Sequence, residues 1–144
     1  KEIIDNYFIE FPKIKNYMDS TITFAKENGF VETIFKRKRF LSNINSGNAT
    51  MRGFDERNAI NAPIQGSAAD IIKIAMINIH KKLLENKMQS KLLLQVHDEL
   101  VFEILKEEEK PIKKLVKQEM MNAVKFNVPL EVEIGVGENW LIAH

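Results

Sequence analysis

Two short apolar runs with only three polar residues between them constrain the fold of this chain most strongly. The runs KLLLQV and LVFEIL occupy residues 91–96 and 100–105, and His97, Asp98 and Glu99 separate them. This pattern predicts a tight β-hairpin with a polar tip. Of the 144 residues, 44% are hydrophobic, so the chain has enough apolar side chains to build a core around such a hairpin.

The first third of the chain predicts two helices and a second hairpin. Apolar residues recur at helical spacing from Ile3 to Phe11, and Pro12 restarts the helix as a first-turn residue would. Gly29 ends that second helix. Residues 30–35 and 39–41 predict two short strands joined by a basic turn.

The remainder predicts further helices and one more strand. Residues 49–62 read as a helix that Pro63 interrupts, and Ser67 with Asp70 resembles a capping box that opens another helix. Three glutamates at residues 107–109 begin the next helix. Alternating apolar residues from Leu130 to Val136 predict a half-buried strand.

These elements predict the α+β class, with a small and mainly antiparallel sheet that contains the hairpin and is packed by several helices. We expect residues 1–144 to form a single unit. Its parts would be helices and a basic hairpin over 1–48, a long broken helix over 49–86, and the polar-tipped hairpin, a helix and a terminal strand over 91–144. Because the chain begins with Lys1 rather than Met, we expect it to be a piece of a longer protein.

Composition excludes several classes of site. The chain has no Cys, which excludes disulfides and thiolate zinc sites. No stretch approaches the roughly 18 apolar residues that span a membrane, so we expect no membrane partner. The net charge is only +1, but the segment 34–57 contains six basic residues against two acidic ones. A polyanionic partner would therefore meet this segment first.

The polar tip at His97, Asp98 and Glu99 is the sharpest candidate site. Adjacent carboxylates at a hairpin end offer the hard oxygen ligands that Mg²⁺ prefers, with substrate or another segment supplying the remaining ligands. Asp is also a common turn residue, so a solvated hairpin end explains the pattern equally well. The residues alone leave both interpretations open.

Two further patterns suit nucleic acid. Arg57, Asn61 and Gln65 follow each other at intervals of four residues, so a helix that persists past Pro63 would place these donors on one face. The basic run at residues 36–39, which includes Arg37 and Arg39, could follow a phosphate backbone. A soluble turn with charged edges accounts for that run as well.

Several motifs in the same order resemble family A DNA polymerases, the bacterial DNA polymerase I type. They are ERNAINAPIQGSAAD at residues 56–70, QVHDE at 95–99 and PLEVEIGVGENW at 129–140, and residues 7–34 also resemble the segment that precedes them in the family. The resemblance covers essentially the whole chain. It implies part of the polymerase palm together with the tail of the fingers.

The resemblance implies template-directed DNA synthesis by a two-metal mechanism with Mg²⁺, in replication and repair. Asp98 would be a metal ligand, Glu99 a supporting catalytic carboxylate, and His97 a contact to the primer end. The other implied DNA contacts are Arg57, Asn61 and Gln65 near the terminal base pair, and Arg37 and Arg39 near the duplex backbone. The implied partners are a primer–template and deoxynucleoside triphosphates, in the cytoplasm of a bacterium and associated with its nucleoid.

The family's first catalytic Asp motif and its nucleotide-binding fingers helix have no counterpart in this sequence, so we expect the isolated piece to be inactive. An exposed sheet edge would favour its dimerisation. A non-catalytic nucleic-acid-binding module is the alternative function. A metal phosphohydrolase that uses His97 and Asp98 would need further His ligands, and only His80 and His144 remain.

Overall fold

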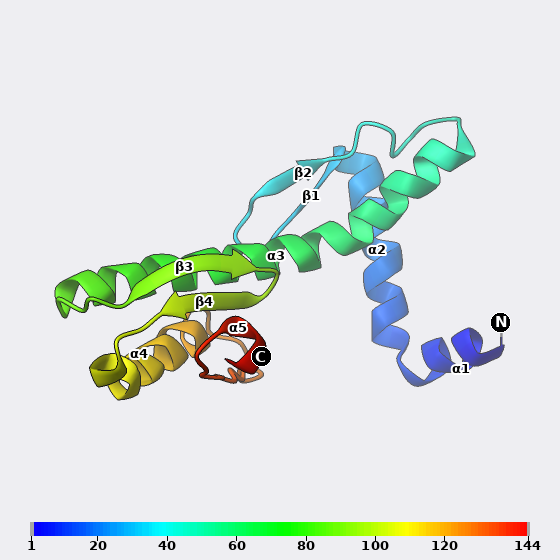
Figure 1. Cartoon of the computed structure of the whole chain (residues 1–144). Coiled ribbons are helices and arrows are strands. Elements are labelled where there is room, and N and C mark those ends of the chain that lie inside the picture. The colour runs from blue at the N-terminus through cyan, green and yellow to red at the C-terminus, as the bar shows by residue number, and fades with distance from the viewer. Residues whose placement is uncertain (1, 144) are drawn as a thin grey trace. The chain divides into compact units, whose positions relative to one another are not determined.

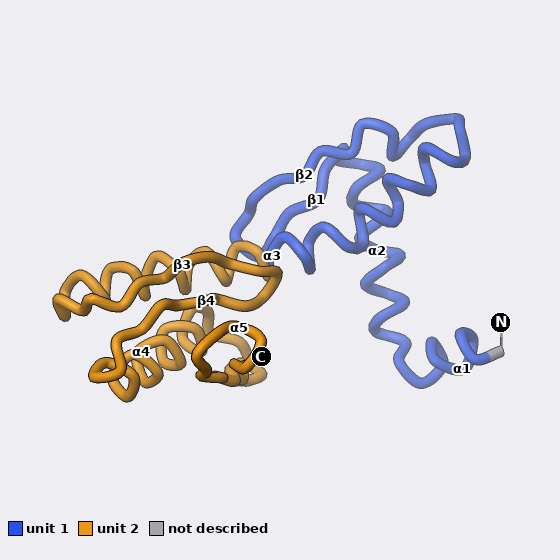
Figure 2. The backbone as a smooth tube through the Cα atoms, viewed as in Figure 1, with its two compact units in different colours: residues 1–67 blue, residues 68–144 orange. Residues whose placement is uncertain are grey.

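The computed structural model describes residues 2–143, which fall into two compact units, residues 1–67 and residues 68–144 (Figure 2). Helices and short antiparallel strands make up both units, which confirms the α+β class (Figure 1). The strands form two separate two-stranded sheets rather than one. Within residues 2–143, no helix is long and apolar enough to cross a membrane. That the whole chain acts as one unit stays a prediction.

The first unit opens with two helices whose ends follow the sequence signals. They are α1 (Glu2–Glu10) and α2 (Pro12–Asn28), and proline stands at the first position of α2 as predicted. Gly29 ends α2 in the left-handed conformation, with φ of 76°, and its N–H donates to the carbonyl of Ala25 at 2.8 Å. Glycine takes this conformation without the steric penalty that a Cβ brings.

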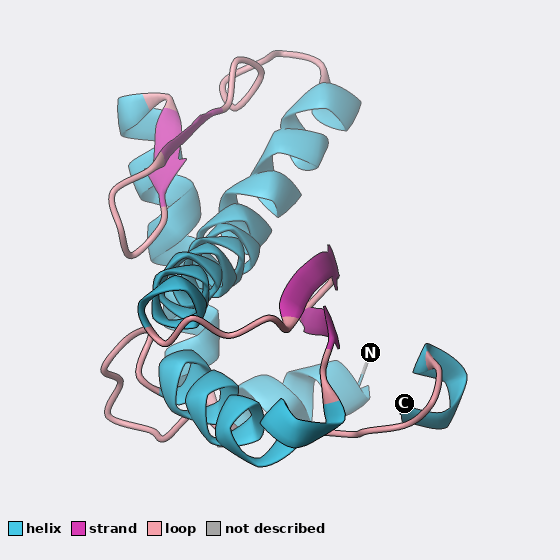
Figure 3. Cartoon of the chain, turned by 60° about the vertical axis from the view of Figure 1, so that its left-hand side comes forward, coloured by secondary structure: helices cyan, strands magenta, loops and turns pink. Residues whose placement is uncertain are grey.

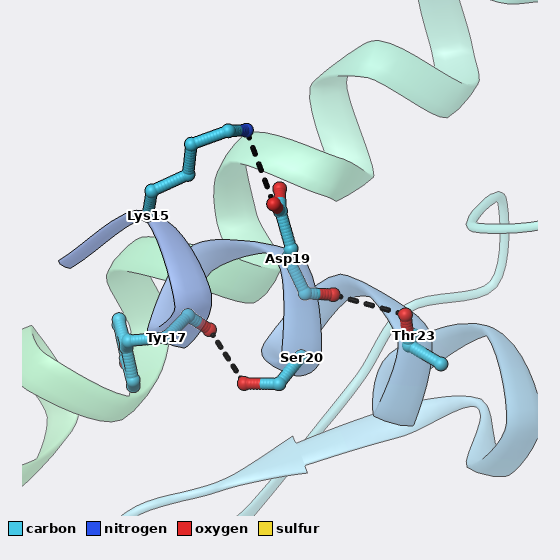
Figure 4. A network of polar contacts seen from close by, with 5 residues as sticks. All are labelled: Lys15, Tyr17, Asp19, Ser20 and Thr23. Atoms are coloured by element: carbon cyan, nitrogen blue, oxygen red, sulfur yellow. Dashed lines mark hydrogen bonds and ion pairs between the residues drawn. The ribbon is translucent and has the colours of Figure 1, made fainter. Parts of the chain in front are cut away.

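The polar side of α2 satisfies its own hydrogen-bonding groups (Figure 4). Lys15 Nζ lies 3.1 Å from Asp19 Oδ2, one helical turn away. The hydroxyl of Ser20 donates to the carbonyl of Tyr17, and that of Thr23 donates to the carbonyl of Asp19, both at 3.0 Å. Exposed pairs of this kind contribute only a few tenths of a kcal/mol each, so α2 depends mainly on its apolar contacts.

The basic hairpin consists of β1 (Phe30–Glu32) and β2 (Lys38–Phe40), paired antiparallel with Phe30 opposite Phe40. The first strand is shorter than the predicted 30–35, and the second has the predicted length but begins one residue earlier, at Lys38. The pairing and the basic turn agree with the sequence. The unit's core lies between α2, this hairpin and the next helix, and its buried members are Ala25, Val31, Leu41, Ile44 and Ala59.

A single helix, α3 (Ala49–Glu85), follows, so the predicted break at Pro63 is wrong. The helix starts where Asn48 Oδ1 accepts the N–H groups of Thr50 and Met51, as an N-cap residue does. Ser67 does not open a helix. Its hydroxyl donates to the carbonyl of Pro63 at 2.5 Å and accepts the N–H of Ile34 at 3.0 Å, so it holds the helix and the hairpin together.

Contacts near Pro63 explain why the helix continues. Proline has no N–H to donate to the carbonyl four residues earlier, and it disturbs the carbonyls of the preceding turn, which together cost about 3 kcal/mol in a helix interior. The hydroxyl of Tyr17 donates to the carbonyl of Ile60 at 3.3 Å, in that same turn. Tertiary hydrogen bonds from α2 and from the hairpin thus offset what the local sequence disfavours.

In the second unit, α3 ends at a left-handed residue other than glycine. Lys87 has φ of 53°, its N–H donates to the carbonyl of Leu84, and the N–H of Met88 donates to the carbonyl of Leu83. These bonds have the pattern of a Schellman motif. The chain then forms β3 (Lys91–Val96) and β4 (Glu99–Glu103), the predicted antiparallel hairpin, shown as paired strands in Figure 3.

The second core forms between α3, β4 and α4 (Glu109–Met121), which follows the short 3₁₀ helix η1 (Lys106–Glu108). Its buried members are Ile79, Leu83, Ile112 and Val116, and Leu100, Phe102 and Ile104 pack against them. The alternation of these last three residues places one face of the hairpin on the helices.

The predicted strand over residues 130–136 is wrong, because residues 130–139 contain no strand and lead directly into α5 (Trp140–Ala143). Alternating hydrophobicity indicates one covered face, but a strand also needs a neighbour whose N–H and C=O groups complete the ladder. Dimerisation through an exposed sheet edge stays a prediction.

The predicted acidic start of α4 contains a specific hydrogen-bond network. The carboxylate of Glu108 accepts the N–H of Gln89 and the N–H of Ser90, both at 2.9 Å, and the hydroxyl of Ser90 at 2.5 Å. The Ser90 hydroxyl in turn accepts the N–H of Leu105 at 3.1 Å. The hydrogen bond from the Ser90 hydroxyl, followed by those from the two backbone N–H groups, lowers the pKa of Glu108 below its ordinary value.

This network predicts a local dependence on pH. Because the pKa of Glu108 is lower in the folded than in the unfolded chain, its contribution to stability is complete above about pH 4.5 and is lost as the pH falls through the folded-state pKa. We expect Glu108→Gln to accelerate hydrogen exchange at the amides of Gln89 and Ser90 at pH 7. The protection factors of these amides, which are corrected for the intrinsic pH dependence of exchange, should also lose most of their pH dependence in the variant.

Glu107→Gln is the matched control, since Glu107 is exposed and precedes Glu108 in the same short helix. It should leave exchange at these two amides unchanged. Equal exchange in the parent and the Glu108 variant would show that the carboxylate does not hold this segment.

Candidate functional site

Arg57, Asn61 and Gln65 form a row on the first half of α3, which we call the donor row. Because α3 continues through Pro63, each step of four residues turns about 40° around the helix axis, and the three positions stay within about 80° of one another. All three side chains are exposed. The structure thus brings them together on one side of a single helix.

Gly53, one turn earlier on α3, lies beside the first member of the donor row at an ordinary contact distance. A Cβ at Gly53 would lie 3.7 Å from Nη1 of Arg57, so the guanidinium group extends back along the preceding turn. Asp55 and Glu56, which come between them in sequence, point their carboxylates to other partners. Asp55 is 5% exposed and accepts the N–H of Asn43 at 2.7 Å, and Glu56 pairs with Lys26 at 2.8 Å.

The four basic residues of the hairpin turn differ in their surroundings. Lys36 Nζ lies 3.4 Å from the carboxylate of Glu32, and Lys38 Nζ lies 4.0 Å from the centroid of the Phe30 ring. These two cations therefore have partners within the hairpin itself. Arg37 reaches α3 instead, where its Nη2 donates to the carbonyl of Gly66 at 3.1 Å.

A small cavity of about 70 Å³ lies where the hairpin meets α3. Its lining includes Arg37 and Arg39 from the hairpin and Gln65 and Gly66 from the helix. Since one water molecule needs about 10–15 Å³ of such volume, the cavity has room for a few waters or a phosphate oxygen but not for a nucleotide. Predicted contacts from two separate motifs thus meet at one place.

The contact between hairpin and helix also contains three residues that are not among the predicted site residues. Thr33, Gly66 and Ser67 join the two elements, and a Cβ at Gly66 would lie only 2.7 Å from the Thr33 methyl carbon. The signal was present in the sequence, because glycine inside a helical pattern is unfavourable and often marks a close approach.

In the second unit, His97 and Asp98 form the two-residue turn between β3 and β4, with Val96 paired to Glu99. His97 has φ of 53°, a left-handed conformation that costs a residue with a Cβ about 1–2 kcal/mol. The amide Nε2 of Gln95 donates to the carbonyl of His97 at 2.8 Å and holds the turn in place. Strain of this kind is concentrated at functional sites.

The strained turn leaves Asp98 exposed at the end of the hairpin, while Glu99 is half-buried at the start of β4. The Asp98 carboxylate is therefore accessible to a hard cation. Among residues 2–143, no group of three or more His, Asp or Glu side chains is close enough together to hold a metal ion. Asp98 thus suits a metal site whose other ligands come from substrate phosphates, from water or from further protein segments.

Comparisons with known proteins agree with these features. The family model described as DNA polymerase family A matches residues 1–142. DNA polymerase I of Caldicellulosiruptor bescii is 54% identical over 139 residues, 96% of this chain and 16% of that protein. DNA polymerase I of Streptococcus pneumoniae is 55% identical over 140 residues, 97% of this chain and again 16% of the relative.

A solved structure has the same fold. It is the POL domain of Pol1 from M. smegmatis, in complex with DNA primer-template and dNTP, and it superposes with a TM-score of 0.95 at 42% sequence identity. The match covers 97% of this chain and 25% of the solved one. The chain therefore spans about one sixth of the length of the curated relatives, and it belongs to DNA polymerase family A.

Proposed function

We propose that this chain is the palm and fingers-tail portion of a DNA-directed DNA polymerase and contributes to nucleotide transfer onto a primer in DNA replication and repair. The observation that carries the proposal is the left-handed His97 turn, which presents the Asp98 carboxylate at the exposed end of a hairpin. The family supports the same reaction, since its members named above are DNA polymerases I. These relatives favour a location in the bacterial cytoplasm, in association with the nucleoid.

Within this function, Asp98 would hold Mg²⁺ and Glu99 would support the site from β4. DNA polymerases of family A use divalent metal ions in general. When bound, a pair of Mg²⁺ ions supplies activation of the primer 3′-hydroxyl and neutralises charge on the leaving pyrophosphate. The turn presents the Asp98 carboxylate at the exposed end of the hairpin, and the exposed imidazole of His97 would contact the primer end.

The DNA partner would be a primer–template bound along the donor row and the hairpin. Arg57, Asn61 and Gln65 present hydrogen-bond donors, which suit the acceptor atoms of the minor groove at the terminal base pair. Arg37 and Arg39 would lie near a backbone phosphate, at the cavity beside Gln65. Deoxynucleoside triphosphates are the second substrate.

A non-catalytic nucleic-acid-binding module is the alternative, and the cavity formed by Arg37, Arg39 and Gln65 is the observation that favours it. A module of that kind would not need the Asp98 carboxylate. A titration with Mn²⁺ in the presence of primer–template distinguishes the two functions. Metal affinity that is lost on Asp98→Asn supports the polymerase, and metal affinity that is unchanged supports the module.

We expect Asp98→Asn, made in the polymerase that contains this chain, to lower single-nucleotide incorporation by roughly three orders of magnitude or more. This is the scale of loss when a group that stabilises transition-state charge is removed. The melting temperature should change little, because the side chain is exposed. Glu103→Gln, an exposed carboxylate at the far end of β4, is the control and should extend normally. Near-normal incorporation by the Asp98 variant would contradict the metal-ligand role.

Removal of donor-row side chains should weaken primer–template binding without affecting metal binding. We expect Arg57→Ala and Gln65→Ala to cost about 1–3 kcal/mol each, or about 5- to 150-fold in affinity, measured by fluorescence anisotropy. Lys81→Ala is the control. Lys81 is exposed on the same helix but lies about 24 Å from Gln65 along its axis, well beyond the Debye length of about 8 Å.

If both row variants melt earlier yet bind primer–template as tightly as the parent, the donor row is structural. The same measurement on Asn61→Ala tests whether the middle member of the row shares its role.

We also propose that residues 1–144 alone do not incorporate nucleotides, since a pair of metal ions about 4 Å apart needs more carboxylates than the Asp98 turn supplies. The purified 144-residue chain should bind primer–template weakly, with an affinity that falls steeply as salt is added. A primer-extension assay over a range of Mg²⁺ concentrations tests this. Template-dependent extension that disappears with Asp98→Asn would contradict it.

A further inference from the structure

The contact between the basic hairpin and α3 is closer than ordinary side-chain packing allows. The carbonyl of Gly66 accepts Nη2 of Arg37 at 3.1 Å, and the hydroxyl of Ser67 accepts the backbone N–H of Ile34 at 3.0 Å. Ser67 is only 7% exposed, so this last bond is shielded from water. Both bonds run from the hairpin turn to two successive residues of one helical turn.

Only glycine fits at position 66 while the hairpin stays where it is. A Cβ there would lie 2.7 Å from the Thr33 methyl carbon and 3.3 Å from Arg37 Nη2. The first distance is shorter than real Cβ atoms show, so a larger residue makes either the Thr33 side chain or the hairpin turn shift. Rotation of Thr33 would take its hydroxyl away from the N–H groups of Phe35 and Arg37, which it accepts at 3.3 Å, so either response disturbs the turn. The hairpin's distance from α3 is therefore set by the missing side chain of Gly66 and the hydroxyl of Ser67.

That distance determines how two kinds of predicted DNA contact are spaced. Arg37 and Arg39 contribute to the cavity lining from the hairpin. Gln65, the donor-row residue that directly precedes Gly66, contributes to it from α3. Contacts to phosphates fix the register of a protein on a duplex, and contacts to base edges read the bases. A fixed offset between the two sets lets both engage the same duplex together, with little loss of conformational freedom on binding.

We propose that Gly66 and Ser67 are positioning residues, which hold the hairpin cations Arg37 and Arg39 at the offset from Gln65 that a bound primer–template requires. This inference rests on the proposed function, because it assumes that the hairpin and the donor row contact DNA. Neither positioning residue has to touch the DNA. Each acts through the placement of the two arginines.

The test measures primer–template affinity against salt concentration in the polymerase that contains this chain. Log affinity falls with log salt by about 0.9 for each phosphate neutralised. We expect Gly66→Ala to reduce the magnitude of that slope by about 1–2, because one or both arginines leave their phosphates although no charge has been removed. Loss of overall stability by itself would lower the melting temperature without changing the slope.

Ser67 provides a second pair of variants if Gly66→Ala does not fold. Ser67→Ala removes the acceptor for the Ile34 N–H and should reduce the slope in the same direction. Ser67→Thr keeps a hydroxyl that can bond back to the carbonyl four residues earlier, as Ser67 does to Pro63, and should restore the parental slope. Equal slopes in the Ala and Thr variants would overturn the role of the hydroxyl.

Arginine variants separate failure of this inference from failure of the proposed function. Arg37→Ala and Arg39→Ala should each reduce the slope by about 0.9. If neither changes the slope, the hairpin does not contact DNA phosphates and that part of the proposed function is wrong. If both reduce it but Gly66→Ala and Ser67→Ala do not, the DNA contacts stand and the positioning role is wrong.

A double-variant comparison gives the last decisive result. In a protein that lacks both arginines, Gly66→Ala should have no further effect on the slope, since the positioning residues act only through them. A further reduction of similar size in that background would show that Gly66 influences DNA binding by another route, and would overturn the inference.

Discussion

One hydroxyl group, that of Ser67, connects the two elements that carry most of the predicted DNA contacts. It donates to the carbonyl of Pro63 within α3 and accepts the N–H of Ile34 from the basic hairpin. A hydrogen bond of this kind contributes about 0.5–1.5 kcal/mol net, and here the buried Ser67 hydroxyl ties the exposed Ile34 segment of the hairpin to α3. The donor row needs the same region of α3 to stay helical, and the cavity beside Gln65 exists only while the hairpin stays docked.

The turn at His97 depends on a constraint of the opposite kind, because here the fold maintains a conformation that the residue itself disfavours. A two-residue hairpin turn requires backbone twist with φ above zero, which Asn or Gly supplies at little cost. His97 adopts φ of 53° without that advantage, and the side chain of Gln95 bonds to its carbonyl. An imidazole and an adjacent exposed carboxylate thus occupy a turn whose left-handed first position glycine would take at lower cost. Local conflicts of this kind are typical of functional sites.

Most of the fold could be predicted from local signals. Pro12 and Gly29 mark the ends of α2, because proline lacks the N–H that the first helical turn leaves unpaired and glycine accepts the left-handed conformation at the end. Both hairpins follow from short β-rich runs around polar turns. The two errors share a physical origin. The helix continues through Pro63 because distant residues, Tyr17 and Ile34, bond to that part of α3, and residues 130–136 form no strand because alternation does not supply a partner strand. Both outcomes depend on tertiary contacts that a local pattern does not contain.

The candidate site was predictable only where it depends on local spacing, and not where it depends on tertiary contacts. The members of the donor row, Arg57, Asn61 and Gln65, could be named because spacing along one helix is local, whereas their meeting with Arg37 and Arg39 at a cavity depends on how the hairpin docks. From the sequence alone, Gly66 is only a residue that weakens a helical pattern. Its reason, the Thr33 methyl that would lie 2.7 Å from a Cβ, is visible only once the hairpin is in place.

The electrostatics of the donor row illustrate how packing can prepare a surface for an anion without adding cations. Asp55 and Glu56 directly precede Arg57, and two exposed carboxylates there would offset its charge and repel phosphates. The fold uses both elsewhere, since buried Asp55 accepts the N–H of Asn43 and Glu56 pairs with Lys26 of α2 at 2.8 Å. The pairing with Lys26 balances the charge of Glu56, the residue that directly precedes Arg57. In the proposed DNA complex, Arg57 would therefore face a phosphate with Glu56 paired to a cation and Asp55 buried. This holds although acidic and basic residues are almost equal in number over the whole chain.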